Sequence, residues 1–363
     1  MRVAVKYGLT ANQPLVDESG DIVGQEAGPV LVRRLLRLFE PAILVGPTSQ
    51  RCNGFDMVPL EFLDANDTLV INMDVIDSTG VWGVLHSTAA EPKLMNFVWW
   101  SASQNYHHRV NKSLLGLTFA LFPTFANSER TASEVREIMR MWTTQPFVEQ
   151  AKLAWVNLGV RVERVQPRHE PEVPVVLYPA IYCHDRKKPW EFIDIVEKVN
   201  KQNRINVQMR LHEAHLISEP AMAMSRHRWA WVGPLRTREG YWEALAGTTA
   251  FLATAQEESY GLEYIEALLA GVIGVFPDAP WARAIVPEGY PFFYNNEDEA
   301  VAMLNRAVTD TEECRAELDR VAGGSFHDWI RETHDDDDFE RALATNVKAW
   351  FGEAPGPAAA LAR

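Results

Sequence analysis

The sequence predicts an α/β protein with two domains, at least one of them built on a parallel sheet. Its 363 residues are enough for about two domains. Residues 249–277 read as strand, helix, strand: a short apolar run over 250–254, apolar residues at helical spacing after Gly261, and a second apolar run over 272–276. Such a βαβ unit implies parallel strands joined by a right-handed crossover. Residues 166–174 hold three prolines and are the best candidate for an interdomain linker.

The composition is that of an ordinary soluble globular protein, with 47% hydrophobic and 23% charged residues. A net charge of -14 disfavours nucleic acid and anionic membranes on average, although it allows a local basic patch. The longest apolar run, near residues 114–126, is too short to cross a bilayer, and the N-terminus reads as a strand instead of a signal peptide. Three scattered cysteines (Cys52, Cys183 and Cys314) fit a reduced, cytoplasmic protein.

The expected domain limits follow from these features. We expect an N-terminal Rossmann-like domain over residues 1–168, a C-terminal one over 169–335, and a last helix with a flexible tail over 336–363. Residues 352–363 are rich in Gly, Pro and Ala and are predicted to be disordered. The four aspartates at 335–338 are interpreted as a solvated acidic run instead of a metal site.

The first domain is predicted to begin with a strand. Strands are expected over residues 3–9, 42–45, 68–72, 96–100 and 117–122. A glycine-bearing loop over 10–28 precedes a helix that begins at Pro29. A second helix is expected over 132–142, with Thr131 and Glu134 as its capping box.

The second domain repeats the alternation of strands and helices. Besides the βαβ unit, strands are expected over residues 175–178, 206–211 and 229–232. Helices are expected up to about Asn200, from about Glu299, over 312–321 and over 339–351, the last with an apolar face.

Two carboxylates stand out in the βαβ unit. Glu258 lies at the turn from strand to helix, and Glu266 lies roughly two helical turns further on. Ligands of open α/β sheets bind at the carboxyl ends of strands, and helix N-termini attract phosphate. A carboxylate beside such a helix start is best explained as an acceptor of hydroxyl groups. A nucleotide sugar supplies both hydroxyls and phosphate.

These residues resemble a known signature. Glu258-Ser-Tyr-Gly261, then Ile265-Glu266-Ala267 and Gly271, resembles the E-x7-E motif of retaining GT-B glycosyltransferases, especially glycosyltransferase family 4. The resemblance implies two Rossmann-like domains whose parallel sheets face a central cleft. It also implies that Glu258 contacts the donor sugar and that Glu266 binds the ribose hydroxyls. The donor diphosphate would lie on the backbone N–H groups of Ser259, Tyr260, Gly261 and Leu262.

A basic turn precedes the first helix of the second domain. The family usually has an Arg and a Lys here that neutralise the donor diphosphate, and Arg186 with either Lys187 or Lys188 matches them. Cations at a helix start are unfavourable for the helix dipole, and a bound anion would account for them. The resemblance therefore implies catalytic roles for Glu258, Arg186 and Lys188, with no metal and no cofactor beyond the donor substrate.

The sequence gives weaker evidence for ligand contacts from the first domain. In GT-B enzymes a long loop after the first strand reaches the donor phosphates, which makes Gly24 and Gly28 candidates, but a plain surface turn explains them equally well. His86 and His107 are candidates for contact with acceptor or sugar. The Asn127-Ser128 turn also resembles the family, without implying chemistry.

The predicted function is transfer of a sugar from a nucleoside diphosphate sugar, such as a UDP-sugar, to an acceptor hydroxyl. The acceptor is left open between a small molecule, lipid or saccharide and the hydroxymethylated pyrimidines of DNA, as in some phage enzymes. Residues 201–238 hold seven Lys or Arg against two Glu, and residues 106–109 are also basic. These local charges favour a DNA acceptor, whereas the net charge opposes it. A nucleotide-sugar epimerase and a non-catalytic nucleotide-sugar-binding protein are the alternatives from other classes.

Overall fold

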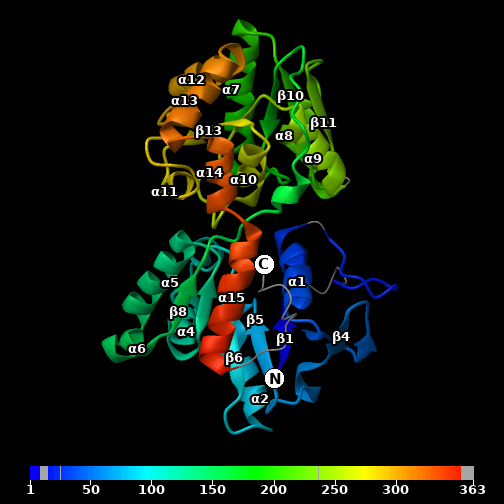
Figure 1. The fold of residues 1–363 in the computed structure, drawn as a ribbon, viewed down its shortest axis with the longest axis vertical. Coiled ribbons are helices and arrows are strands. Elements are labelled where there is room, and N and C mark those ends of the chain that lie inside the picture. Colours follow the sequence, from blue (N-terminus) through cyan, green and yellow to red (C-terminus); the bar gives the residue numbers. More distant parts are fainter. Residues whose placement is uncertain (9–14, 25, 236, 353–363) are drawn as a thin grey trace. The chain divides into compact units, whose positions relative to one another are not determined.

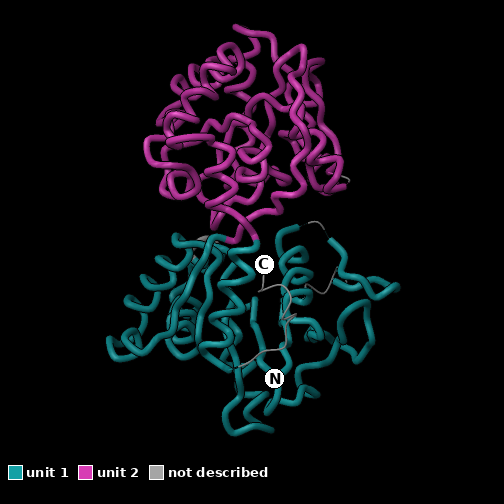
Figure 2. Tube along the Cα trace, viewed as in Figure 1, with its two compact units in different colours: residues 1–157, 337–363 teal, residues 158–336 magenta. Residues whose placement is uncertain are grey.

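The computed structural model describes residues 1–8, 15–24, 26–235 and 237–352, and it divides the chain into two compact units. Unit 1 comprises residues 1–157 and 337–363, and unit 2 comprises residues 158–336 (Figure 2). The chain passes between the units at 157–158 and at 336–337, so the proline-rich stretch 166–174 lies inside unit 2. The tail predicted to be disordered lies, from residue 353 onward, outside the described residues.

Unit 1 is built on an eight-stranded sheet in the order β3-β4-β2-β1-β5-β6-β7-β8. All neighbouring strands are parallel except β3 and β4. Its central strands are almost wholly apolar because both faces of a parallel sheet are covered. The strands are β1 (Arg2–Lys6), β2 (Ala42–Val45), β3 (Gln50–Arg51), β4 (Phe55–Val58), β5 (Thr68–Asn72), β6 (Lys93–Val98), β7 (Thr124–Ala126) and β8 (Leu153–Trp155).

Helices of unit 1 connect and cover these strands (Figure 1). They are α1 (Ala27–Leu38), α2 (Ser78–His86), α3 (Ala102–Asn105), α4 (Arg109–Leu121), α5 (Glu129–Trp142), α6 (Gln145–Gln150) and α15 (Asp336–Phe351), with short 3-10 turns η1 (Leu60–Phe62) and η2 (Val75–Asp77). From Asp337 onward α15 belongs to unit 1. Its Phe339 ring lies 5.8 Å from Phe97 and 6.0 Å from Phe125, and Arg34 packs over it.

Two predictions for unit 1 were wrong. Residues 117–122 are not a strand, since almost all of them belong to α4, where Leu115, Thr118 and Phe119 are buried at helical spacing. Helix α5 begins at Glu129, three residues before the predicted start. Its cap is Ser128, whose Oγ accepts a hydrogen bond from the Thr131 backbone N–H at 3.2 Å, so the predicted capping box at Thr131 is displaced by one turn.

A network of neutral side chains crosses the middle of this sheet and reaches the Asp77 carboxylate, which accepts from the Asn72 amide at 2.8 Å. The Asn72 side chain donates to Ser78 Oγ at 2.8 Å, and Ser78 Oγ donates to Asn96 Oδ1 at 2.7 Å. The Asn96 amide then donates to Thr124 Oγ1 at 3.0 Å. All four side chains are buried, and the hydrogen bonds join β5, β6 and β7.

Unit 2 is built on a six-stranded, wholly parallel sheet in the order β11-β10-β9-β12-β13-β14. Its strands are β9 (Val175–Tyr178), β10 (Asn206–Leu211), β11 (Ala230–Pro234), β12 (Ala250–Leu252), β13 (Ile273–Pro277) and β14 (Phe293–Tyr294). The strand order reverses between β9 and β12. The crevice at the carboxyl ends of these two strands is therefore where an open α/β sheet binds ligands.

Helices of unit 2 lie on both faces of this sheet. They are α7 (Pro189–Gln202), α8 (Glu219–Met224), α9 (Arg238–Ala246), α10 (Leu262–Leu269), α11 (Pro280–Arg283), α12 (Glu297–Thr309), α13 (Thr311–Ala322) and α14 (Phe326–Thr333), with 3-10 turns η3 (Val162–Arg164), η4 (Asp185–Lys187) and η5 (Glu213–His215). The predicted βαβ unit is present as β12, α10 and β13. None of the described helices has the length and apolar character needed to cross a membrane.

The segments by which the chain enters and leaves unit 2 pair with each other and with the turn before α10. Val160 forms a parallel bridge with Asp335 and donates to the His334 carbonyl at 2.8 Å. The Gly159 N–H donates to Tyr260 Oη at 3.0 Å, and Tyr260 Oη lies 2.7 Å from His334 Nδ1. His334 Nε2 lies 3.1 Å from the Ile285 carbonyl. Since a carbonyl only accepts, Nε2 carries the proton and Tyr260 donates to Nδ1.

Candidate donor site

The site that the sequence predicts lies at the strand-order reversal of unit 2. The loop after β9 carries η4 and the basic turn, and the loop after β12 carries Glu258. Two hydrogen bonds join these loops: Gln256 N–H donates to the Arg186 carbonyl at 2.9 Å, and Thr254 Oγ1 donates to the Lys187 carbonyl at 2.7 Å. The structure therefore brings the predicted basic turn and the first predicted glutamate together.

Lys187 is the cation that meets the predicted carboxylates. Its Nζ donates to Glu258 Oε1, and it donates to Glu263 Oε1 at 2.7 Å. The Tyr264 hydroxyl donates to the same Glu258 oxygen at 3.0 Å. The side chains of Lys187 and Glu258 are only 17% and 14% exposed. The sequence leaves open whether Lys187 or Lys188 is the phosphate ligand, and it does not single out Glu263.

Burial sets the ionisation of this group. Burial raises the pKa of Glu258 above its ordinary value, and Lys187 only partly offsets this. Burial alone would lower the pKa of Lys187, but the carboxylates of Glu258 and Glu263 outweigh it and raise that pKa. Lys187 therefore stays charged at neutral pH and holds Glu258 in place.

Glu266 has a cation of its own. Its carboxylate accepts two hydrogen bonds from the Arg238 guanidinium, Nη2 to Oε1 and Nη1 to Oε2, the second at 3.3 Å. The Glu266 side chain is 9% exposed, and burial raises its pKa, which Arg238 partly offsets. Sequence reasoning included Arg238 only as one charge in the basic excess over residues 201–238, because no local pattern links it to Glu266.

Lys188 pairs with a carboxylate outside the predicted motif. Lys188 is the only non-glycine residue of the described chain with a positive φ, 45°, and it precedes Pro189, the first residue of α7. Its side chain is 37% exposed and pairs with Glu191 at 2.9 Å. Arg186 is exposed on η4. A left-handed conformation costs an L residue roughly 1 kcal/mol, and such strain is concentrated at functional sites.

The turn of Ser259, Tyr260, Gly261 and Leu262 opens α10. Gly261 has a φ of 84°, and a Cβ there would come within 2.6 Å of the Tyr264 ring, so only glycine fits. The first backbone N–H groups of a helix point out of its N-terminus. The predicted diphosphate contacts thus lie at a real helix start between Glu258 and Glu266.

The candidates in unit 1 have other local explanations. Gly28 lies inside α1, where a Cβ would come within 2.2 Å of Tyr7 Oη. His86 stacks on Trp82 at the end of α2, which leads back to the amino end of β6, the edge opposite to the one where ligands bind. Gly24 has a φ of 102° and its carbonyl accepts from Arg33 at 2.8 Å, and His107 is exposed. For all four residues, ligand contact stays a prediction.

An acidic and aromatic group that sequence reasoning missed lies at the carboxyl ends of β1 and β5. Lys6 Nζ pairs with Asp77 at 2.6 Å, whereas the neighbouring Asp74 is half-buried, and burial and Asp77 raise its pKa. Burial and Asp74 also raise the pKa of Tyr106. The Tyr7 ring, directly after β1, lies 6.0 Å from the Trp99 ring, directly after β6. The only sequence signal was an aspartate two residues after a predicted strand.

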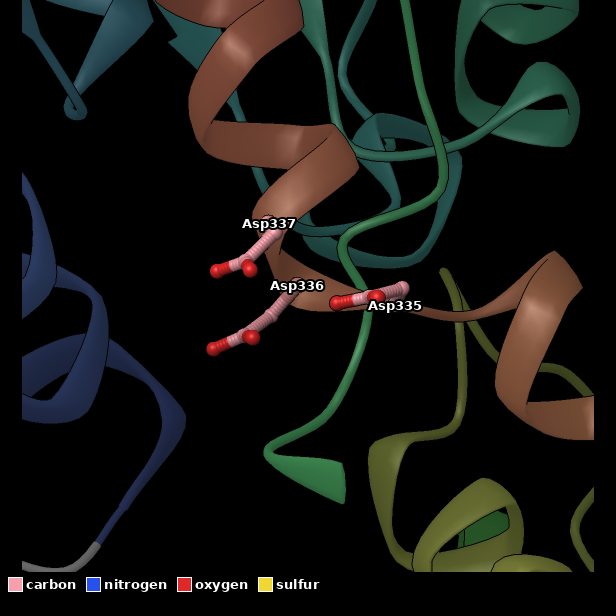
Figure 3. Close-up of side chains that lie close together, drawn as sticks. All are labelled: Asp335, Asp336 and Asp337. Carbon is pink, nitrogen blue, oxygen red and sulfur yellow. The ribbon is translucent and has the colours of Figure 1, made fainter. Parts of the chain in front are cut away.

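The acidic run at the start of α15 is only partly solvated. Asp335, Asp336 and Asp337 each offer an oxygen within 4.8 Å of the others (Figure 3). The prediction of a solvated run was wrong for Asp336, which is buried and pairs with Arg161 Nε at 2.7 Å. Asp337 and Asp338 are exposed, as predicted.

No protein-family model and no curated protein sequence matches this chain. Solved structures do resemble it, at low sequence identity. The sucrose-phosphate synthase of Thermosynechococcus elongatus aligns with 10% identity and a TM-score of 0.68, over 97% of this chain and 99% of that one. HepE of Anabaena, solved with UDP, aligns with 11% identity and a TM-score of 0.69, over 96% of this chain and 100% of that one. A glycosyltransferase of Rickettsia africae ESF-5 aligns with 11% identity and a TM-score of 0.67, over 96% and 98%.

This chain has the GT-B fold. The predicted fold class, two Rossmann-like domains with parallel sheets, is confirmed. Within the GT-B fold, unit 2 is the domain whose strand-order reversal carries Glu258 and Glu266.

Proposed function

We propose that this chain is a glycosyltransferase that moves a hexosyl group from a nucleoside diphosphate sugar to an acceptor hydroxyl. The observation that carries the proposal is the pair of buried glutamates beside the start of α10, each held by its own cation. Burying charge is costly, and buried charges with perturbed pKa values are concentrated at functional sites. Structural neighbours solved with UDP or UDP-glucose support UDP-sugars as the first donors to test.

The proposed donor contacts follow the geometry. Glu258, fixed by Lys187 and Tyr264, would accept hydrogen bonds from the sugar hydroxyls. Glu266 would accept those of the ribose. The amides at the start of α10, with Arg186 and Lys188, would stabilise the charge that grows on the diphosphate as it leaves. Fixed cations in these positions make a metal ion unnecessary, and the resemblance to family 4 supports retention of the anomeric configuration.

The acceptor is proposed to be an uncharged saccharide or polyol. At the carboxyl ends of β1 and β5, Asp74 and Asp77 make the edge of unit 1 acidic, and Tyr7, Trp99 and Tyr106 make it aromatic. Aromatic rings pack on sugar faces, and carboxylates accept hydrogen bonds from hydroxyls. The same carboxylates repel phosphate, which favours a neutral acceptor over the DNA alternative.

A donor screen tests this function. Thermal unfolding is followed with UDP-, GDP- and ADP-sugars without metal, for the wild-type chain and for Glu266→Ala. We expect one diphosphate class to raise the unfolding temperature of the wild type and not of the variant. Absence of any shift in the folded wild type would overturn the proposal. Turnover of the donor without any acceptor, with the sugar epimerised, would instead establish the epimerase alternative.

Acceptors are then compared with the donor that binds. Maltose and glycerol are the neutral probes, and an oligonucleotide with hydroxymethylcytosine is the polyanionic one. We expect transfer to a neutral probe with little salt dependence. Transfer to the oligonucleotide that falls steeply with salt would establish the DNA alternative.

A further inference from the structure

We propose that Arg238 is a positioning residue that fixes the Glu266 carboxylate to accept hydrogen bonds from the ribose hydroxyls of a ribonucleotide. The inference rests on the donor site proposed above and adds a residue outside the resemblance to family 4. It concerns contacts within unit 2 only, between the start of α9 and the middle of α10.

The geometry is that of a two-point clamp. Arg238 donates through Nη2 and Nη1 to the two different oxygens of Glu266. A carboxylate has about four lone-pair sites, so a bidentate arginine leaves one on each oxygen. The arginine occupies the two lone pairs that face forward, so the two that remain lie on the outer flanks of the carboxylate, where ribose hydroxyls can donate. A carboxylate held at both oxygens also cannot rotate away from such a donor.

The position of Arg238 is not explained by the stability of α9. It is the first residue of that helix, after the cap Thr237, and a cation there opposes the helix dipole. Its guanidinium lies 5.4 Å from the centroid of the Tyr241 ring, one turn further along α9. This cation–π contact restricts the Arg238 side chain in addition to the ion pair. Arg238 is therefore held toward Glu266 from two directions.

The other charged groups near Glu266 cannot replace Arg238. Glu263, on the same helix, has the same charge as Glu266 and is itself held by Lys187 at 2.7 Å. Arg164 acts on Glu266 only through its more distant charge, and Tyr241 is neutral at physiological pH. Without Arg238 the buried carboxyl would take up a proton more readily, and its orientation would no longer be fixed.

The test is calorimetric titration of the full chain with UDP and 2′-deoxy-UDP at pH 6 and pH 8, repeated with the guanosine and adenosine pairs. For the wild type we expect the ribonucleotide to bind on the order of tenfold more tightly than its deoxy form, with the same ratio at both pH values. In Arg238→Met we expect ribonucleotide affinity to fall at least about tenfold, the ratio to shrink toward one, and affinity to fall further at pH 6.

Two further variants separate positioning from folding. Arg238→Lys keeps the charge without the two-point contact, so it should restore the pH independence and only part of the preference for ribose. Arg226→Met removes an exposed arginine of the same unit and should behave as the wild type. If Arg238→Met does not fold, Arg238→Lys carries the test.

The outcomes for the two proposals are distinct. The role of Arg238 would be overturned if Arg238→Met, or folded Arg238→Lys, kept the affinity, ribose preference and pH profile of the wild type. The proposed donor site would still stand in that case if Glu266→Ala lost nucleotide binding. Wild-type affinity in Glu266→Ala, or no nucleotide binding by the wild type, would overturn both.

Discussion

The two units bury polar groups of different kinds at their sheets. In unit 1, Asn72, Ser78, Asn96 and Thr124 form a neutral network in the middle of the sheet. In unit 2, at the carboxyl edge, the buried groups include ions, among them Lys187 with Glu258. A neutral hydrogen-bonded group stabilises a fold modestly, whereas an ion pair loses hydration that its own attraction does not always offset. The first kind joins strands of the sheet, whereas the second is the kind that we propose serves a ligand.

The largest effect is expected from Lys187→Met, which leaves Glu258 and Glu263 without their shared cation. Breaking a buried ion pair costs about 3 kcal/mol of unfolding free energy, and a misplaced Glu258 should lower kcat by roughly 100-fold or more. Denaturant unfolding and donor turnover measure the two effects. Lys198→Met is the control, since Lys198 pairs with Glu297 at an exposed position and should show neither effect. Wild-type turnover in Lys187→Met would show that the buried ion pair of unit 2 is not needed for function.

His334 is a buried group of unit 2 that stays neutral, and we expect it to affect stability instead of turnover. Burial lowers the pKa of His334 to about 4, below its ordinary value near 6.5, so as the pH falls the unfolded chain takes up a proton first. Stability is therefore full above about pH 6.5 and is lost as the pH falls toward 4, by at most about 3 kcal/mol. His334→Gln should unfold with a shallower pH dependence over this range. An unchanged pH dependence would show that other groups control it.

Asn96→Ala tests the neutral network. It removes the acceptor of the Ser78 hydroxyl and the amide that donates to Thr124 Oγ1, which should lower the unfolding free energy by about 2 kcal/mol. Nucleotide affinity of the folded protein should stay the same, because the change lies within unit 1. Denaturant unfolding and calorimetric titration separate these effects, with the exposed Asn66→Ala as control. A loss of affinity without a loss of stability would contradict the division of roles.

The smallest effect is expected at the exposed end of the acidic run. Asp338 pairs with Arg341 one turn along α15, and both side chains are about half exposed. Exposed pairs of this kind contribute little, so Asp338→Asn should change the unfolding free energy by less than about 0.5 kcal/mol. Asp336→Asn, which weakens the buried pair with Arg161, should cost more. Equal effects of the two variants in thermal unfolding would mean that burial does not determine how much these ion pairs contribute to stability.

The fold was predictable because its signals are local. The apolar runs around Gly261 and the spacing of Glu258 and Glu266 lie within one stretch of about thirty residues, and the structure forms that stretch as expected. A six-residue apolar run carries no such information, since its periodicity does not separate a strand from a buried helix turn. Residues 117–122 were misassigned for that reason.

The partners of the site residues were not predictable from the sequence. Arg238 lies 28 positions before Glu266 and on another helix, so only the folded sheet brings them together. Which of the two lysines pairs with Glu258 depends on the left-handed backbone at Lys188, which turns the side chains of Lys187 and Lys188 in different directions. The Asp74 group depends on the pairing of β1 with β5, which no spacing along the chain encodes.

The hydrogen-bonded series from Gly159 through Tyr260 to His334 has a kinetic consequence. It ties the turn that opens α10 to both segments at the boundary of unit 2, so these three pieces of chain should open and close as one cooperative unit. A nucleotide that binds the ordered turn more tightly than the open one must, by linkage, also lower the population of the open form of those segments. The amide proton of Gly159, which is bonded to Tyr260, should therefore exchange with solvent more slowly when the donor is bound, and would report occupancy of the site from a residue 99 positions before Glu258.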